Sequence, residues 1–268
     1  MSVVYQFERL CTGLRHSAPL KGLAPLWNVV RPAYNGVLNL AGRRGLVRHI
    51  NGTDTIRVLP QCRDISEIYE PAVWSLLMSR AKPGFRVIDV GAHWGLYAMA
   101  FGLRVKPSGN VLAAEPDPEN LAILRKNLAL NGLGSVVKVL PFGMSDRNRE
   151  GSFISAGVES HVSDKGRVQI CLKTLDSVVG DEAWDLLLID VEGHEQRVLQ
   201  GAQSLLKDSR RRPKTIVIEV HPYAWSVLGV TSDSLLQKLR QFGYQVFQPD
   251  GARVEKIERY GHVVATIS

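Results

Sequence analysis

Five short, almost uninterrupted apolar runs between residues 85 and 220 constrain the fold more than any other feature of the chain. They are FRVIDV (85–90), NVLAAEP (110–116), SVVKVLPFG (135–143), WDLLLIDV (184–191) and TIVIEV (215–220). Strands that are buried on both faces of a parallel sheet have this composition. Segments with apolar residues at helical spacing lie between the runs, at 120–132 and 195–208. Strands that alternate with helices predict a doubly wound α/β fold.

Further elements are predicted around this core. Between the third and fourth runs, two β-like pieces, GSFIS (151–155) and RVQICLKT (167–174), and the short helical turn LDSVV (175–179) predict an excursion from the sheet. A helix is predicted over 232–243, and two last strands after it should form a hairpin at the sheet edge. The helix after the second run should be capped by Asp117 and closed by Gly132 in a left-handed conformation.

The first 64 residues are predicted to form an extension that precedes the main domain at 65–268. Asn51-Gly52 is a turn signal between two β-like segments and predicts a small hairpin. Residues 65–80 are expected to form a helix that leads into the first parallel strand. For residues 1–45 we expect a helical lid or a dimer arm, with a helix on a membrane surface as the alternative.

Composition and charge narrow the setting without fixing it. The sequence contains no stretch of about 18 apolar residues, so no membrane-spanning helix is predicted. The N-terminus lacks the pattern of a signal peptide. Cys11, Cys62 and Cys171 lie far apart, which is typical of reduced thiols in a cytoplasmic protein. The net charge of +7 is concentrated at 42–50 and 207–214. Such basic clusters can bind nucleic acid, anionic lipid or an acidic substrate. The alternative is that they are solvated loop charges.

A glycine turn follows the first apolar run. The strand ends at Asp89, and the sequence GAHWG (91–95) then opens a helix. Gly91 is expected to let a ligand approach the main chain, and Gly95 to let the helix start close to the strand. The helix N-terminus and free backbone N–H groups should face a crevice, the usual ligand site of such sheets. His93, inside the turn, is expected either to orient a substrate or to cap the helix.

The ends of the second and third runs carry polar residues. Glu115 ends the second strand, where a carboxylate can accept hydrogen bonds from both hydroxyls of a ribose. The alternative is a capping or solvated carboxylate. Ser145 and Asp146, after the third strand, are predicted contacts to an adenine edge.

The turn differs from the GxGxxG signature of dinucleotide sites. It has an acid before its first glycine, where a pyrophosphate would be repelled. S-adenosylmethionine carries an amino acid part, a ribose and an adenine, so the pattern favours this methyl donor over NAD.

Several motifs together resemble the FkbM family of S-adenosylmethionine-dependent methyltransferases, over roughly residues 50–265. They are VIDVGAHWGLYAMAFG (87–102), AAEPDPENLAILRKNLALNG (113–132), TLDSVV (174–179), LLLIDVEGHEQRVLQGA (186–202) and TIVIEVHP (215–222). The resemblance implies a Rossmann-like class I methyltransferase fold: a mostly parallel seven-stranded sheet with an antiparallel last strand. It also implies O-methylation of a hydroxyl on a sugar, glycan, polyketide or other small molecule. Trp94 departs from the family pattern, which more often has a small aliphatic residue there.

The resemblance also assigns residues to the cofactor. Along the methionine part it places Asp89, Gly91, Ala92 and Gly95, on the ribose Glu115, and near the adenine Ser145 and Asp146. The expected cofactor-binding set is completed by His93, Pro116, Asp117 and Asp190.

Acids and bases gather at the ends of the fourth and fifth strands. The sequences DVEGHE and EVHP supply Asp190, Glu192, His194, Glu195, Glu219 and His221. Methyl transfer to a hydroxyl needs a positioned nucleophile and a group that takes its proton. We expect Asp190 or Glu192 to hold the hydroxyl and His194 or His221 to accept the proton. For each histidine, the alternative is a structural role as a hydrogen-bonded residue at a strand end.

Other interpretations stay open. Asp190, Glu192, Glu219 and His221 suit a divalent metal such as Mg²⁺ or Mn²⁺, although no ligand repeat supports one. The basic charge raises a nucleic-acid or protein methyltransferase as the main rival, yet the chain lacks the NPPY-type motif of base N-methylases. A non-catalytic binding module on the same fold is the second rival. The expected partner is a small-molecule or glycan substrate, with a homodimer as a further expectation.

Overall fold

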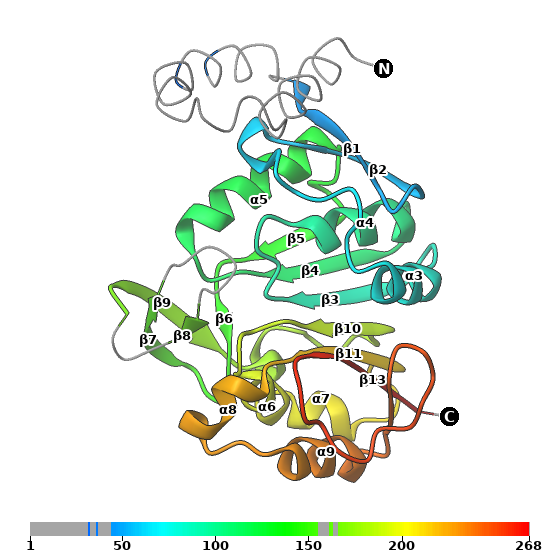
Figure 1. Ribbon diagram of the computed structural model, residues 1–268, viewed down its shortest axis with the longest axis vertical. Coiled ribbons are helices and arrows are strands. Elements are labelled where there is room, and N and C mark those ends of the chain that lie inside the picture. The colour runs from blue at the N-terminus through cyan, green and yellow to red at the C-terminus, as the bar shows by residue number, and fades with distance from the viewer. Residues whose placement is uncertain (1–31, 33–35, 37–43, 155–160, 163–165, 268) are drawn as a thin grey trace, which may run out of the picture. The chain divides into compact units, whose positions relative to one another are not determined.

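The computed structural model describes residues 32, 36, 44–154, 161–162 and 166–267 (Figure 1). The arm or lid predicted for residues 1–45 therefore lies almost wholly outside the described residues. The chain divides into two compact units, Met1–Tyr69 and Glu70–Ser268. Among the described residues, no helix is both long enough and apolar enough to cross a membrane.

The first unit contains the predicted hairpin. Strands β1 (Leu46–Ile50) and β2 (Asp54–Val58) pair in antiparallel register. Asn51 and Gly52 have φ angles of 49° and 69°, the left-handed conformation that asparagine and glycine adopt most easily in turns. The hairpin is followed by the short 3-10 helix η3 (Pro60–Cys62).

Helix α3 (Pro71–Arg80) is shorter than the helix predicted over 65–80. Its N-cap residue, Glu70, is left-handed with a φ of 39°. Pro71 explains the boundary, because a proline disfavours helical geometry in the residue before it but fits the first helical turn. The prediction of a helix over 65–70 is therefore wrong.

The second unit is built on the predicted seven-stranded sheet. Its strands lie in the order β12-β13-β11-β10-β3-β4-β5, and β13 is antiparallel to its neighbours β11 and β12. Their bounds are β3 (Arg86–Val90), β4 (Asn110–Ala114), β5 (Val137–Leu140), β10 (Leu186–Ile189), β11 (Thr215–Val220), β12 (Gln245–Phe247) and β13 (Gly261–Thr266). The α/β fold class, the antiparallel last strand and the terminal hairpin are confirmed.

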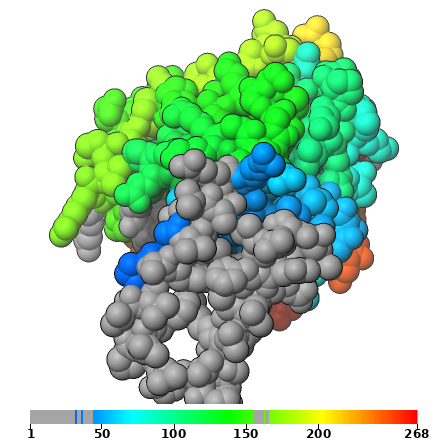
Figure 2. Space-filling model, turned by 90° about the horizontal axis from the view of Figure 1, so that it is seen from above, coloured from blue at the N-terminus to red at the C-terminus, as the bar shows by residue number. Residues whose placement is uncertain are grey.

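Helices cover both faces of this sheet, as Figure 1 shows. One face carries α4 (Leu96–Val105) and α5 (Pro118–Leu130), and the outer surface of this region is green in Figure 2. The other face carries α6 (Glu195–Gln200), α7 (Gln203–Lys207) and α9 (Ser232–Gln241). Their leucines pack on isoleucines and valines of the central strands in one large apolar core. Helix α8 (Pro222–Leu228) adds Trp225 to that core.

Two local predictions about these helices have different outcomes. Asp117 caps α5 by accepting hydrogen bonds from two backbone N–H groups, and Gly132 is left-handed, as expected. The single helix predicted over 195–208 is wrong, because the chain breaks into α6 and α7 at Gly201. There the backbone passes so close to Ser145 that a Cβ would lie 2.0 Å from the Ser145 carbonyl oxygen.

The predicted excursion between β5 and β10 forms a small separate sheet. Its strands are β6 (Gly143–Met144), β7 (Arg149–Ile154), β8 (His161–Val162) and β9 (Val168–Lys173), in the order β6-β9-β7-β8. The 3-10 helix η5 (Leu175–Ser177) returns the chain to the main sheet.

Candidate active site

The predicted site residues gather where β3, β4, β10 and β11 end. The parallel register places Gly91, Asp190 and Glu219 just beyond or at the carboxyl ends of three adjacent strands. The antiparallel strand β13 adds His262 directly opposite Glu219. Ligands of open α/β sheets bind at this edge.

The glycine turn packs more tightly than the sequence suggested. The N–H groups of Gly91 and Ala92 both donate to the carbonyl of Ala114 at 3.0 Å. Gly91 has a φ of 92°, and a Cβ there would lie 1.8 Å from the carbonyl oxygen of Asp190. The expectation of free N–H groups is therefore wrong for Gly91 and Ala92. The absent side chain of Gly91 makes room for the end of β10.

Gly95 has the role that was predicted for it. It is left-handed with a φ of 88°, and a Cβ there would lie 2.3 Å from a methyl carbon of Leu124 in α5. The glycine thus lets α4 begin close against α5.

Glu115 ties the turn to the start of α5. Its carboxylate accepts hydrogen bonds from the backbone N–H groups of His93 and Asp117, both at 2.8 Å, and from the side chain of Asn120 at 3.5 Å. Burial raises the pKa of Glu115 to about 7, and these three donors limit the rise. The contacts match the alternative interpretation of a capping carboxylate, and the ribose contact stays a prediction.

Two buried polar atoms beside the turn lack a hydrogen-bond partner among the described residues: Oδ2 of Asp89 and Nε2 of His93. Burial, with the nearby charge of Glu115, raises the pKa of Asp89 to about 7. Burial lowers the pKa of His93, whose ring stacks on Trp94 at 4.6 Å. Buried polar atoms are rarely left unpaired, so an unpaired acceptor here fits a polar ligand with donor groups.

The remaining predicted cofactor contacts lie at the same end of the sheet. Ser145 is buried and donates to the carboxylate of Asp146 at 2.9 Å. Asp117 uses its carboxylate to cap α5, and the partly buried Pro116 separates it from Glu115. The indole N–H of Trp94 donates to the side chain of Asn120 at 3.0 Å, which fixes the bulky ring against α5.

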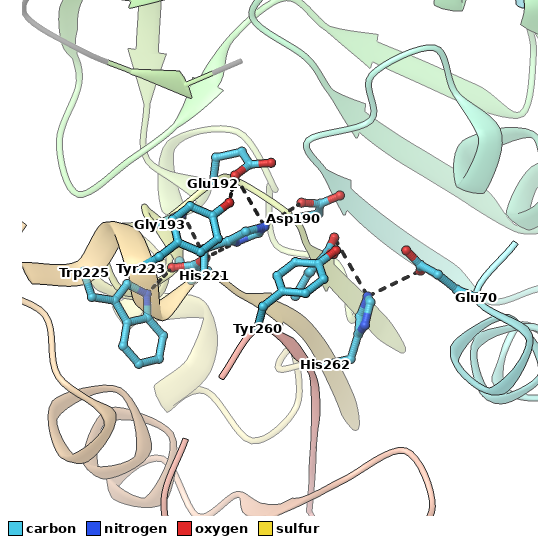
Figure 3. Close-up of polar contacts among 11 residues, drawn as sticks. Glu70, Asp190, Glu192, Gly193, His221, Tyr223, Trp225, Tyr260 and His262 are labelled. Carbon is cyan, nitrogen blue, oxygen red and sulfur yellow. Dashed lines mark hydrogen bonds and ion pairs between the residues drawn. The ribbon is translucent and has the colours of Figure 1, made fainter. Parts of the chain in front are cut away.

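A buried carboxylate–imidazole pair is the centre of the other half of the site (Figure 3). Nδ1 of His221 lies 2.7 Å from Oε1 of Glu195, and the two side chains are 2% and 0% exposed. Glu195 also accepts hydrogen bonds from the backbone N–H of Gly193 and the indole N–H of Trp225, each at 3.0 Å. The carboxylate is therefore held from three directions and fixes the orientation of the imidazole.

The charges of this pair follow from those contacts. Burial alone would raise the pKa of Glu195, but hydrogen bonds from His221 and Trp225 outweigh it and lower the pKa. Burial alone would lower the pKa of His221, but the hydrogen bond to Glu195 and the charges of Glu192, Glu195 and Glu219 raise it. His221 is thus a stronger base than a free imidazole.

The second ring nitrogen of His221 faces two more predicted residues. Nε2 lies 3.6 Å from Oε2 of Glu192 and 4.0 Å from Oδ1 of Asp190. Both distances are longer than a hydrogen bond, so Nε2 stays available to a donor between them. Glu192 is left-handed with a φ of 41° and accepts a hydrogen bond of 2.6 Å from the hydroxyl of Tyr223.

A second polar cluster adjoins Asp190. Glu219 accepts a hydrogen bond from the hydroxyl of Tyr260 and lies 3.9 Å from Nε2 of His262. The same nitrogen lies 3.4 Å from Glu70, which also accepts from Tyr97 at 2.7 Å. Burial, together with a hydrogen bond to Glu219 and its charge, holds the pKa of Asp190 well above its usual range. Burial likewise raises the pKa of Glu70.

His194 faces a different direction from His221. It is the N-cap residue of α6, and its Nε2 lies 3.2 Å from the carbonyl oxygen of Val162 in β8. The structure therefore brings Asp190, Glu192 and His221 together and turns His194 toward the small sheet.

Two sets of side chains have the composition of metal ligands. Asp190, Glu219 and His221 each present one ligand atom, and these atoms lie within 4.8 Å of one another. Glu70, Glu219 and His262 form a second set of the same kind. Hydroxyl donors and imidazoles already contact most of these carboxylates, so the metal stays an alternative interpretation.

Sequence reasoning missed part of this site. The sequence predicts no separate role for Glu195 within its acidic group, although its position at the start of a helix beside Gly193 is a usable signal. His262 was detectable in principle, because pairing the last strand with TIVIEV in antiparallel register sets it opposite Glu219. Nothing in the local sequence of Glu70 or Tyr260 indicates their place in the cluster.

Two methyltransferases of known name are similar in sequence to this chain. Hexuronic acid methyltransferase AglP of Haloferax volcanii is 28% identical over 164 residues, covering 57% of this chain and 62% of that protein. The 2-O-methyltransferase NoeI of Sinorhizobium fredii is 27% identical over 154 residues, covering 48% of this chain and 62% of that protein. The chain thus spans about three fifths of the length of each relative.

A crystal structure of an FkbM methyltransferase from Methylobacillus flagellatus aligns with a TM-score of 0.47 at 20% identity, covering 68% of this chain and 43% of that chain. The model of the methyltransferase FkbM domain matches residues 89–246, more than half of the 268 residues. The matched segment runs from Asp89 in β3, through the Glu195–His221 pair, to β12. This chain therefore belongs to the FkbM family of S-adenosylmethionine-dependent methyltransferases.

Proposed function

We propose that the protein O-methylates a hydroxyl of a sugar, glycan or other small molecule, with His221 as the general base. The observation that carries this proposal is the buried His221 ring, which is held through Nδ1 by Glu195 and presents Nε2 between Asp190 and Glu192. A hydroxyl that lies between the two carboxylates can donate its proton to Nε2.

The residues of the glycine turn fit the methyl donor. The unpaired Oδ2 of Asp89 is an acceptor for an ammonium group, and the buried Nε2 of His93 adds a polar atom beside it. Glu115, Ser145 and Asp146 are the proposed contacts for the ribose and adenine. When bound, S-adenosylmethionine supplies a methyl group on a positively charged sulfur, with a neutral thioether as the leaving group.

The chain's own residues account for the proton. The acceptor hydroxyl would lose its proton to Nε2 of His221 as its oxygen is methylated. The Nδ1–H donates to Glu195, which fixes the tautomer and stabilises the imidazolium that forms. Asp190 and Glu192 orient the hydroxyl and add further negative charge near that cation.

The surroundings of this base support a small acceptor over a nucleic acid. The carboxylates that surround His221 would repel a phosphate backbone, although the whole chain carries a net charge of +7. The printed names of AglP and NoeI describe a hexuronic acid methyltransferase and a 2-O-methyltransferase, which agrees with a carbohydrate hydroxyl as acceptor.

Cytoplasmic location is part of the proposal. It is supported by the free thiol of Cys171. The homodimer and the membrane contact of residues 1–45 stay predictions.

His221→Asn tests the proposed base. Asparagine is too short to reach the acceptor, so we expect turnover to fall about a hundredfold or more while calorimetric affinity for S-adenosylmethionine stays within about twofold. His194→Asn is the matched control and should lose less than about tenfold. Equal losses in both variants, or a His221→Asn enzyme with normal turnover, would contradict the assignment of the base.

A further inference from the structure

The carboxylates around His221 and His262, where the acceptor is proposed to bind, form a negatively charged acceptor site in a chain whose net charge is positive. Asp190 and Glu192 pair with His221, and Glu70 and Glu219 pair with His262. All four carboxylates thus have histidine, and neither lysine nor arginine, as their ion-pair partner among the described residues. The acceptor faces a negative site within a protein of net charge +7.

Two tyrosine rings flank the same histidine. Tyr223 and Tyr260 are 66% and 56% exposed, although large aromatic side chains are usually buried. Their ring centroids lie 5.7 Å and 5.4 Å from that of His221, the first in an edge-on arrangement.

The hydroxyls of the two tyrosines are already committed. That of Tyr223 donates to Glu192, and that of Tyr260 donates to Glu219. The rings are therefore held in place beside His221 (Figure 3), and both side chains are largely exposed. Exposed apolar surface at a polar site marks a place where a ligand packs.

His221 supplies an independent sign that a ligand belongs here. Its side chain is 2% exposed, and among the described residues the polar contacts of Nε2 are those to the two carboxylates, at 3.6 Å and 4.0 Å. This nitrogen is aimed between two acids at distances longer than a hydrogen bond, so it can accept a hydrogen bond from a bound hydroxyl.

We infer that the acceptor is a pyranose ring without an anionic substituent: a neutral sugar or an amino sugar. Its C–H face packs on the tyrosine rings, its hydroxyls or ammonium donate to the carboxylates, and one hydroxyl meets Nε2 of His221. A carboxylate or phosphate on the ring would lie among groups of its own charge and be disfavoured. This inference rests on the proposed function and differs from what the name of AglP says of that relative.

Matched sugars test the inference. For the methyl glycosides of glucose, galactose and mannose, three forms that differ only at carbon 6 are compared: the hydroxymethyl sugar, its 6-amino-6-deoxy form and its uronic acid. Formation of S-adenosylhomocysteine is measured at saturating S-adenosylmethionine with EDTA present. In at least one series, the neutral or amino form should have a kcat/KM about tenfold or more above that of its uronic acid.

The outcomes separate the inference from the proposed function. The inference is overturned if uronic acids turn over as fast as their neutral partners. It is also overturned if a non-sugar hydroxyl turns over and no sugar does. Either result leaves the proposed methyltransferase activity standing. Failure to bind S-adenosylmethionine in calorimetry overturns the proposed function itself. Binding of S-adenosylmethionine without turnover of any sugar of the three series also overturns the inference.

Variants of Tyr223 and Glu192 test whether these two side chains bind the sugar and disfavour its uronic acid form. Tyr223→Leu removes the ring and should raise the KM for the preferred sugar about tenfold, whereas Tyr223→Phe keeps the ring and should raise it less. Glu192→Gln removes one charge and should narrow the gap between neutral sugar and uronic acid severalfold. An unchanged gap in Glu192→Gln together with an unchanged KM in Tyr223→Leu would place the acceptor elsewhere.

Discussion

The two halves of the site are built by different means. At the ends of β3 and β4, polar groups are fixed by backbone hydrogen bonds within one short stretch, as when Glu115 binds the N–H groups of His93 and Asp117. At the ends of β10 and β11, side chains from distant segments fix one another, as when Glu195 holds His221 and Trp225. The first half is local and keeps unpaired polar atoms for a ligand. The second half is assembled by the fold and raises the pKa of His221.

Gly91→Ala should have the largest effect, because Gly91 joins the two halves. Its Cβ would lie 1.8 Å from the carbonyl oxygen of Asp190 at a φ of 92°, so the strand ends must separate. We expect a loss of at least about 3 kcal/mol in the free energy of unfolding, measured by denaturant titration. Gly134→Ala is the control, since nothing lies within 4 Å of its Cβ position. Similar stability of the two variants would contradict the close approach.

Glu195→Gln should disrupt only the half of the site at the ends of β10 and β11. The wild-type kcat/KM should rise with pH as His221 loses its proton, with an inflection above the ordinary histidine value because neighbouring carboxylates raise its pKa. Without the charge of Glu195 the pKa of His221 falls, so the inflection should move to lower pH and the maximal rate should drop about tenfold to a hundredfold. The measurement is the pH profile of kcat/KM.

Trp225→Phe provides the comparison for that profile. It removes a hydrogen bond to the same carboxylate at 3.0 Å but leaves His221 paired. Its inflection should stay within about 0.3 pH units of the wild type, because the charge beside the imidazole is retained. An inflection that shifts equally in both variants would indicate a general loss of structure.

Glu115→Ala should weaken the first half by a smaller amount. It leaves the N–H groups of His93 and Asp117 without their acceptor, and we expect affinity for S-adenosylmethionine to fall by about 1–3 kcal/mol in calorimetry. Glu115→Gln keeps one acceptor oxygen and should lose less. If cofactor affinity is unchanged while stability falls, Glu115 is only the cap of the turn.

Removal of metal should have the smallest effect. Tyr260 and His262 already contact Glu219, so turnover with excess EDTA should match that without it. A loss of activity that Mg²⁺ or Mn²⁺ restores would instead indicate that Asp190, Glu219 and His221 bind a metal ion and that this ion holds the acceptor hydroxyl.

The same division explains what could be predicted from the sequence. The apolar runs gave the sheet, and Asp117 and Gly132 gave the ends of α5, because those signals lie within a few residues of the structure they determine. The break at Gly201 could not be predicted, since it depends on a carbonyl that lies 56 residues earlier, at Ser145. For the same reason, the choice of His221 over His194 required the positions of Glu195 and Val162.

The place of β13 has a consequence for the order of events during synthesis. This strand lies between β11 and β12 in the sheet, although it follows both of them in the sequence. A nascent chain that has emerged only as far as α9 already contains the glycine turn, Glu195 and His221, but β11 still has an open edge. Tyr260 and His262 are synthesised after these residues, so the glycine turn and the Glu195–His221 pair can form before the cluster around Glu219 is complete.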